Sequence, residues 1–292
     1  MGEDVLTVDN FSVVYDVEPP VEAVKHVSLH LKRGEILGLA GESGCGKTTL
    51  VYGIQRLLKD PAIITSGTAI FHDAGAVGAG PNGTGAKDID ILKLSDKEIQ
   101  NFRWDKISMV FQGAMNALNP VVRIGKQLDD VFRTHRPGMS KAERLAACED
   151  LLTVVGVGPE RIKSYPHELS GGMRQRVMIA MALALKPQVM IMDEPTTALD
   201  VLVEQQILTK IRELRNEFGF AVIFITHDLQ LLLEISDRIA IMKEGEIVEI
   251  DTAANIYHRA QHAYTQKLLN SFPSLTGERG GFVRGGIDGG GN

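Results

Sequence analysis

The chain has 292 residues, of which 44% are hydrophobic and 23% are charged, with a formal net charge of −6. This apolar content excludes wholesale disorder, and the acidic balance argues against a general nucleic-acid binder, which is usually basic. The longest apolar run, 177–185, is shorter than the ~18 residues of a spanning helix. The start MGEDVL lacks the pattern of a signal peptide. We expect one large or two modest domains that neither cross a membrane nor are secreted.

Two cysteines, Cys45 and Cys148, are too few for a disulfide framework or a zinc cluster, which favours a reducing cytoplasm. Cys148 falls among the apolar residues of an expected helix and is interpreted as a core thiol. Two glycine-rich stretches, 73–88 and 277–292, are predicted to be solvated, flexible segments.

The first 187 residues change from strand patterning to helical patterning. Short apolar runs separated by turns predict strands in LTVDNFSVVY, VSLHLKRGE and ILGLAG. The following expected elements are a helix from Gly46 to about Asp60-Pro61, a strand at Thr68–Phe71, a helix at 94–102 opened by a capping box of Ser95 and Glu98, a buried strand at 107–112, and a helical region from about 121 to 186 that includes an amphipathic helix at 140–156.

After Pro187 strands and helices alternate. The pattern predicts a strand in VMIMD, a helix in VLVEQQILTKIRELRNEFG, a strand in FAVIFIT, a helix in DLQLLLEIS, and strands in RIAIMKEG and EIVEI. Such alternation favours a mostly parallel, covered sheet. We predict an α/β core in two parts, with the following segments: 1–112 and 188–250 for the core, 113–187 for an inserted helical subdomain, 251–276 for a helical extension, and 277–292 for a flexible tail.

The segment GESGCGKTT fits the phosphate-binding pattern G-x-x-x-x-G-K-[ST] and stands between an expected strand and an expected helix. Its glycines let backbone N–H groups turn toward phosphate oxygens, and the helix N-terminus adds a positive dipole. Lys47 would reach the β- and γ-phosphates, and the Thr48 hydroxyl would bind Mg²⁺. The predicted nucleotide-binding residues of this loop are Gly41, Glu42, Ser43, Gly44, Cys45, Gly46, Lys47, Thr48 and Thr49.

Two further segments carry chemistry. VMIMDE is an apolar strand that ends in two carboxylates, where Asp193 would hold Mg²⁺ and Glu194 would orient the attacking water. In LSGGMRQR, the residues Ser170, Gly171 and Gly172 open a helix with free N–H groups, which makes a second anion site. Two such sites in one chain make sense if two subunits pair head to tail, each closing over the nucleotide of the other.

The motifs together identify a family. The phosphate-binding loop, Gln112 after a strand, LSGGM, MDE, ALD (198–200) and TH (226–227) stand in one order over about residues 5–250. This set resembles the nucleotide-binding subunit of ABC transporters. The resemblance implies a P-loop NTPase, RecA-like ABC ATPase core with an N-terminal antiparallel β subdomain and an inserted α-helical subdomain. It also implies ATP and Mg²⁺ as cofactors, and hydrolysis of ATP.

The resemblance implies further roles for single residues. Gln112 corresponds to a glutamine that senses Mg²⁺ and water, and His227 to a histidine that contacts the γ-phosphate. Asp200 corresponds to an aspartate at the dimer seam, and Tyr15 to an aromatic residue that stacks on adenine. Alternatives from the residues alone remain: His227 as a cap of the following helix, Glu194 as a cap or solvent carboxylate, and Tyr15 as a half-buried strand tyrosine.

Two other stretches, FQGAMNALNPVVRIGKQL and HAYTQKLLNSFPSL, resemble the ATPases of the peptide, oligopeptide and nickel importers, a group in which some members import oligosaccharides. Members commonly read FQDPM where this chain has Gly113-Ala114 after Gln112, and the 73–88 loop looks like an insertion. Many peptide-importer ATPases carry a C-terminal cysteine cluster, whereas this chain has no cysteine after Cys148. The missing cluster argues against peptides and favours oligosaccharides, so oligopeptides and oligosaccharides are both candidate substrates.

The resemblance also implies partners: a second homologous ATPase subunit in a heterodimer, two transmembrane permeases and an extracytoplasmic binding protein, with no nucleic acid. The chain would lie at the cytoplasmic face of the membrane. Three alternatives are a soluble ABC ATPase of DNA repair or translation, a catalytically silent subunit, and an exporter ATPase. The first would carry a long coiled coil or a second ATPase cassette, the second would lack Glu194, His227 or the signature, and the 262–275 resemblance argues against the third.

Overall fold

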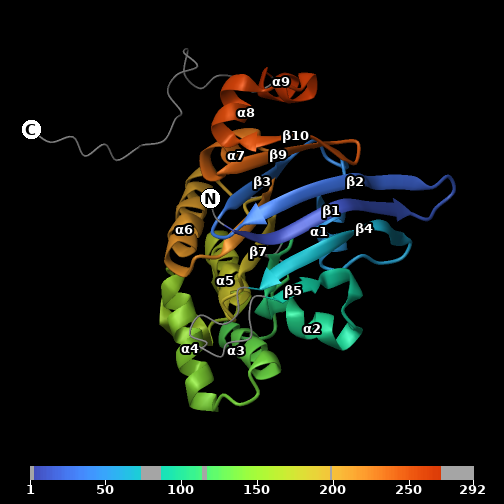
Figure 1. Cartoon of the computed structure of the whole chain (residues 1–292). Helices are drawn as coiled ribbons and strands as arrows, with labels where there is room; N and C mark the ends of the chain where they lie inside the picture. The colour runs from blue at the N-terminus through green and yellow to red at the C-terminus, as the bar shows by residue number, and fades with distance from the viewer. Residues whose placement is uncertain (1–2, 74–86, 114–116, 198, 271–292) are drawn as a thin grey trace, which may run out of the picture.

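The computed structural model describes residues 3–73, 87–113, 117–197 and 199–270. Figure 1 shows the strands of residues 4–32 on one side of the molecule and the helices of residues 141–154 and 201–218 on the other. The strands are β1 (Asp4–Tyr15), β2 (Val21–Lys32), β3 (Ile36–Ala40), β4 (Ala62–Asp73), β5 (Lys87–Asp90), β6 (Ile107–Val110), β7 (Val189–Asp193), β8 (Ala221–Ile225), β9 (Arg238–Lys243) and β10 (Glu246–Thr252).

The α-helices begin and end as follows: α1 (Lys47–Ile54), α2 (Asp96–Asp105), α3 (Ile124–His135), α4 (Lys141–Val154), α5 (Gly171–Leu183), α6 (Val201–Phe218), α7 (Leu229–Ile235), α8 (Ala253–Arg259) and α9 (Ala263–Asn270). Short 3-10 helices lie at Ile91–Lys93, Pro159–Lys163 and Pro166–Glu168. Helices α3 and α4 lie at one end of the molecule, and α8 and α9 at the opposite end (Figure 1).

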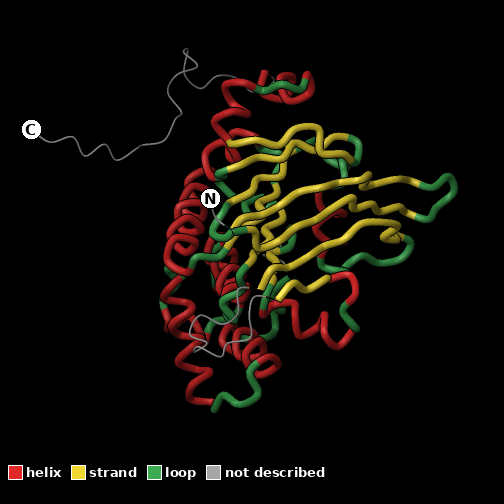
Figure 2. Tube along the Cα trace, viewed as in Figure 1, coloured by secondary structure: helices red, strands yellow, loops and turns green. Residues whose placement is uncertain are grey.

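Two sheets form within the described residues, as the tube in Figure 2 shows. The first has the order β2-β1-β4-β5 and is antiparallel throughout. The second has the order β10-β9-β3-β8-β7-β6, with β9, β3, β8, β7 and β6 parallel and β10 antiparallel to β9. The predicted α/β core with an N-terminal antiparallel β part is confirmed.

The parallel strands are buried on both faces, and their alternate residues enter two different cores. In β7, Val189 and Ile191 pack with α1 and the antiparallel sheet. Their neighbours Met190 and Met192 pack with α3 to α7 on the other face. A strand between two apolar layers needs apolar residues at every position, which explains why VMIMD shows no polar alternation.

The helical region predicted between about 121 and 186 contains α3, α4 and α5. Helix α4 opens with a capping box in which Ser140 and Glu143 exchange hydrogen bonds with each other's backbone. Cys148 on this helix is 1% exposed. Burial raises the pKa of its thiol to about 12. Its predicted place as a core thiol is confirmed.

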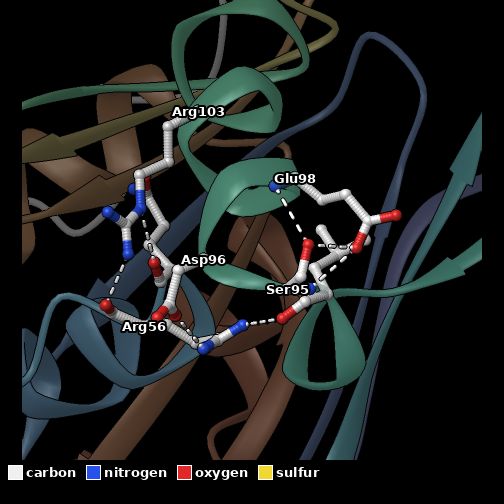
Figure 3. Close-up of polar contacts among 7 residues, drawn as sticks. Arg56, Ser95, Asp96, Glu98 and Arg103 are labelled. Carbon is white, nitrogen blue, oxygen red and sulfur yellow. Dashed lines mark hydrogen bonds and ion pairs between the residues drawn. The ribbon is translucent and has the colours of Figure 1, made fainter.

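Helix α1 ends earlier than the predicted boundary at Asp60-Pro61, because a distant side chain stops it at Ile54. The guanidinium of Arg103 donates to the carbonyl oxygens of Gln55 and Arg56 (Figure 3). Arg56 has a positive φ of 53° and pairs with Asp96, 3.2 Å away. These carbonyls are therefore used by a residue of α2, and the chain turns there.

Two strand boundaries also differ. The strand predicted at Thr68–Phe71 belongs to β4, which starts at Ala62 because it pairs with most of β1, from Tyr15 opposite Ala62 to Leu6 opposite Phe71. The strand predicted at 107–112 ends at Val110, so that Gln112 lies beyond it. The interior of the glycine-rich loop (74–86), residues 114–116, Ala198 and the tail from 271 lie outside the described residues.

Within the described ranges, no helix combines the length and the apolar character needed to cross a membrane.

Candidate nucleotide-binding site

The phosphate-binding loop joins the end of β3, an inner strand of the parallel sheet, to α1. Gly46 is the N-cap of α1, with a φ of 106° and no side-chain cap. A Cβ at Gly46 would lie 2.2 Å from the carbonyl oxygen of Ala23, and one at Gly41 would lie 2.2 Å from that of Met242. Only glycine fits both positions. The first turn of α1 presents uncapped N–H groups, which suit a phosphate.

Lys47 lies inside this loop and is 7% exposed. Its ammonium group donates to the carbonyl oxygens of Gly41, at 2.7 Å, and Glu42, at 2.9 Å. Its Nζ atom lies 3.6 Å from the sulfur of Cys45. Ser43 and Gly44 are exposed, and nothing lies within 4 Å of a Cβ built on Gly44. The loop therefore encloses the lysine and opens at its tip.

Tyr15, the last residue of β1, lies beside the first turn of α1. Its hydroxyl lies 3.2 Å from the hydroxyl of Thr49, within hydrogen-bonding distance. Two of the predicted nucleotide-binding residues, 34 positions apart in the sequence, thus meet at one end of the loop.

Asp193 ends β7 and is fully buried. Burial raises the pKa of this carboxyl, and Glu194 adds to the rise, whereas the Thr48 side chain and Lys47 oppose it. Neither carboxylate oxygen has a hydrogen-bond partner of ordinary geometry among the described residues. An unsatisfied buried carboxylate beside a threonine hydroxyl matches the oxygen donor set that Mg²⁺ prefers.

Glu194 is the point where three elements meet. It follows β7 with a φ of 46°, and its N–H donates to Ile225 at the end of β8. One carboxylate oxygen accepts from the amide of Gln112, at 3.0 Å, and from the hydroxyl of Thr197, at 3.0 Å. The other oxygen lies 3.2 Å from Nδ1 of His227. A non-glycine residue at positive φ is costly and is held only where its surroundings fix it.

Burial alone would raise the pKa of Glu194, but the hydrogen bonds from His227, Thr197 and Gln112 together lower it below its ordinary value. The group is therefore a carboxylate at neutral pH. His227 is 66% exposed in its side chain. Helix α7 is capped by Asp228, which accepts from two backbone N–H groups. His227 is thus not the cap of this helix, and it faces Glu194 instead.

Sequence reasoning missed Thr197, although it stands only three residues after Glu194. A threonine in a turn is unremarkable in sequence, and its contact with Glu194 depends on the turn's geometry. The sequence signal that could have found Thr197 is its position, three residues after the paired carboxylates.

A second group of predicted residues lies elsewhere. Ser170 caps α5 by accepting from the N–H of Met173, and Asp200 caps α6 by accepting from that of Val203. A Cβ on Gly172 would lie 2.6 Å from Val203, so the starts of α5 and α6 touch. Over the part of the chain that the structure describes, no hydrogen bond joins Ser170, Gly171, Gly172 or Asp200 to the phosphate-binding loop or to Glu194. The predicted site residues of one chain therefore fall into two separate sets.

Comparison with known proteins agrees with this geometry. Residues 24–197 match the family described as ABC transporter. Residues 248–286 match the family described as oligopeptide/dipeptide transporter, C-terminal region.

The chain is 41% identical over 277 residues to the dipeptide transport ATP-binding protein DppD of Bacillus subtilis, covering 94% of this chain and 78% of that protein. It is 42% identical to the oligopeptide transport ATP-binding protein OppD of the same organism, covering 87% and 68%. It is 41% identical to the glutathione import ATP-binding protein GsiA of Salmonella typhimurium, covering 96% of this chain but only 44% of GsiA.

Among solved structures, the chain resembles the dimeric ATP-binding cassette MJ0796 in a post-hydrolysis state bound to ADP and Pi. The TM-score is 0.70 at 30% identity, covering 85% of this chain and 98% of that one. The chain therefore belongs to the ABC transporter family, as an ATP-binding and ATP-hydrolysing subunit that shares its C-terminal region with oligopeptide and dipeptide transporters.

Proposed function

We propose that the phosphate-binding loop and the Glu194 cluster form one half of an ATP hydrolysis site. In this assignment the N–H groups at the start of α1 and the Lys47 ammonium bind the phosphates, with the loop residues 41–49 around them. Tyr15 stacks on the adenine, which its place beside Thr49 supports. The observation that carries the proposal is the convergence of Gln112, Glu194 and His227, which come from three separate segments.

Mg²⁺ would be held by the Thr48 hydroxyl, the amide oxygen of Gln112 and, directly or through water, Asp193. When bound, the ion neutralises charge on the phosphate oxygens. The unsatisfied buried oxygens of Asp193 support this placement. The side-chain N–H of Gln112 donates to Glu194, so the amide oxygen of Gln112 remains available to bind the cation.

Glu194 orients the attacking water and accepts its proton, and its lowered pKa keeps it in the carboxylate form that this task needs. The exposed side chain of His227 contacts the γ-phosphate as charge develops on it in the transition state. Catalysis of this type depends mainly on positioning and charge stabilisation, because the phosphoryl group needs little covalent help from the protein.

The second half of each site comes from a homologous ATPase subunit. The γ-phosphate bound to the partner would be contacted by Ser170, Gly171 and Gly172. Asp200 would lie at the interface between the two subunits. Val201 and Leu202, just after Asp200, are 71% and 75% exposed. Adjacent exposed apolar side chains beside this segment support a surface that a partner covers.

The transported substrate that we propose is a small peptide. Support comes from the match of residues 248–286 to the oligopeptide/dipeptide transporter region and from the names of the relatives. The partners would be a second ATPase, two permeases and an extracytoplasmic binding protein, and the chain would dock at the cytoplasmic face of the membrane. The segments 1–112 and 188–250 would form the ATP-binding core, 113–187 the moving helical subdomain, and 251–276 a C-terminal extension followed by a tail.

Glu194→Gln tests the ATPase assignment. The amide keeps the size of the side chain and cannot accept a proton, so ATP binding should persist while hydrolysis falls at least about a hundredfold. Binding of a fluorescent ATP analogue and phosphate release measure the two effects. Glu213→Gln, the same change at an exposed position of α6, is the control and should hydrolyse ATP at the normal rate. Undiminished hydrolysis by Glu194→Gln would remove the proposed role.

The substrate class is tested with the transporter reconstituted in proteoliposomes. The binding protein is loaded with a dipeptide, a longer oligopeptide or an oligosaccharide, and ATP hydrolysis is measured. The proposal expects stimulation by a peptide-loaded protein. Stimulation by the oligosaccharide alone would contradict it.

A further inference from the structure

Helix α9 contacts the phosphate-binding loop, although it lies far away in the sequence. The backbone N–H of Glu42 donates to the hydroxyl of Tyr264, at 3.1 Å. Tyr264 is 7% exposed, and the ammonium of Lys243 lies 5.5 Å from the centre of its ring. Burial raises the pKa of this phenol, so that it stays protonated at neutral pH.

The turn between β9 and β10 supports the same loop from behind. The N–H of Gly245 donates to the carbonyl oxygen of Cys45, at 3.0 Å, and the carbonyl of Met242 closes against Gly41. The rear of the loop is therefore held by residues 242–264, while its tip at Gly44 faces open space.

The position of Tyr264 is itself fixed by β10. The two carboxylate oxygens of Glu249 accept from the N–H groups of Gln261, at 2.6 Å, and His262, at 3.1 Å. The N–H of Tyr264 donates to Nδ1 of His262, at 3.1 Å, and the next residue, Thr265, is fully buried. The start of α9 is thus tied to the sheet and cannot swing freely.

The peptide group between Gly41 and Glu42 connects Tyr264 to Lys47. A trans peptide is planar, and its N–H and C=O point in opposite directions. In this peptide the N–H points to Tyr264 and the C=O accepts from Lys47, at 2.7 Å. Holding the N–H therefore sets the direction of the carbonyl that positions the ammonium group.

We infer that Tyr264 is a positioning residue for ATP binding: through the Gly41–Glu42 peptide it orients Lys47, and so the C-terminal region sets the affinity of the phosphate-binding loop. This inference rests on the proposed function of Lys47 in binding phosphates. Tyr264 does not touch the reacting atoms, so its effect falls on ATP affinity. The turnover rate at saturating ATP depends on Glu194 and His227, which lie on other segments.

The test is Tyr264→Phe in the full chain, which removes the hydroxyl and keeps the ring. The Kd of a fluorescent ATP analogue should rise about three- to tenfold, as expected for the net loss of one hydrogen bond. In the assembled transporter the KM for ATP should rise similarly, with kcat unchanged. Tyr257→Phe, the same change on α8, is the matched control and should leave Kd and KM unchanged.

Glu249→Gln provides a second variant, because it weakens the tie that fixes α9. This variant should also raise the Kd for the ATP analogue. The double variant with Tyr264→Phe should have a Kd no higher than that of the single variant that binds less tightly, because both changes act through the same contact. A Kd of Tyr264→Phe within twofold of the wild type, with binding abolished in Lys47→Ala, would overturn the inference alone. Full binding by Lys47→Ala would overturn the proposed function of the loop instead.

Discussion

The two glycine-rich helix starts of this chain satisfy their backbone N–H groups in opposite ways. Helix α1 begins at Gly46, in a left-handed conformation and without a side-chain cap. Helix α5 begins at Ser170, whose hydroxyl accepts from the N–H of Met173. Both starts can receive an anion by virtue of their dipole, yet only the second supplies its own hydrogen-bond acceptor.

The difference indicates how far each helix start is shaped for a ligand by its own chain. The loop before α1 is enclosed by Ala23 and Met242 and already contains its lysine, so its shape is fixed by the chain. At the start of α5, the Ser170 hydroxyl already accepts from one backbone N–H. Within the described part of the chain, Ser170, Gly171 and Gly172 make no hydrogen bond to the phosphate-binding loop or to Glu194. The first start thus suits a nucleotide held by one subunit, and the second suits contact with one held by a partner.

Gly46→Ala should give the largest effect. A Cβ would lie 2.2 Å from the backbone oxygen of Ala23, at a φ of 106° that alanine rarely adopts, so the loop must deform. We expect ATP binding by the single chain to weaken more than about a hundredfold, measured with a fluorescent analogue.

Gly172→Ala is the matched control for this change, because the atoms nearest to its Cβ belong to the side chain of Val203 and not to a backbone oxygen. Nucleotide binding by the single chain should stay near the wild-type value. If both variants lost nucleotide binding equally, the contrast between the two helix starts would fail.

Ser170→Ala should have a smaller and different effect. Loss of the N-cap should lower the free energy of unfolding by about 1 kcal/mol, measured by urea denaturation. ATP binding by the single chain should not change, while hydrolysis in the assembled transporter should fall. Ser140→Ala removes the cap of α4 and is the control; it should cost similar stability without affecting hydrolysis. Equal hydrolysis by the two variants would show that Ser170 is only a cap.

Thr197→Val should have the smallest effect. Its hydroxyl is one of the groups that lower the pKa of Glu194, so its removal raises that pKa. The carboxylate form is lost as pH falls through the folded-state pKa, and the acid side of the pH–rate profile should therefore move to higher pH. Thr209→Val, which removes a hydroxyl from α6, is the control. An unshifted profile would mean that Glu194 does not titrate in the rate-limiting step.

Local patterns predicted the strands and helices that carry the candidate site. The loop at 41–49, the strand end at Asp193 and Glu194, and the helix start at Ser170 each depend on residues close together in sequence. Apart from the contact of Thr197 with Glu194, the contacts that escaped prediction are long-range. The end of α1 is set by Arg103, and the brace on Glu42 by Tyr264, 222 positions away. No periodicity reports such contacts, because they exist only once the sheets have assembled.

The contact between Gly172 and Val203 has a consequence for genetics. It places the start of α5 against the start of α6, the helix that follows β7. In the proposed pairing of two unlike ATPase subunits, the α1 and the α5 of one chain would serve different ATP molecules. Substitutions in both α1 and α5 of one chain would disable both composite sites. If one subunit carried the α1 substitution and the other the α5 substitution, both would fall on the same composite site, and the other site would stay active. Complementation between alleles would therefore reveal which nucleotide each segment serves.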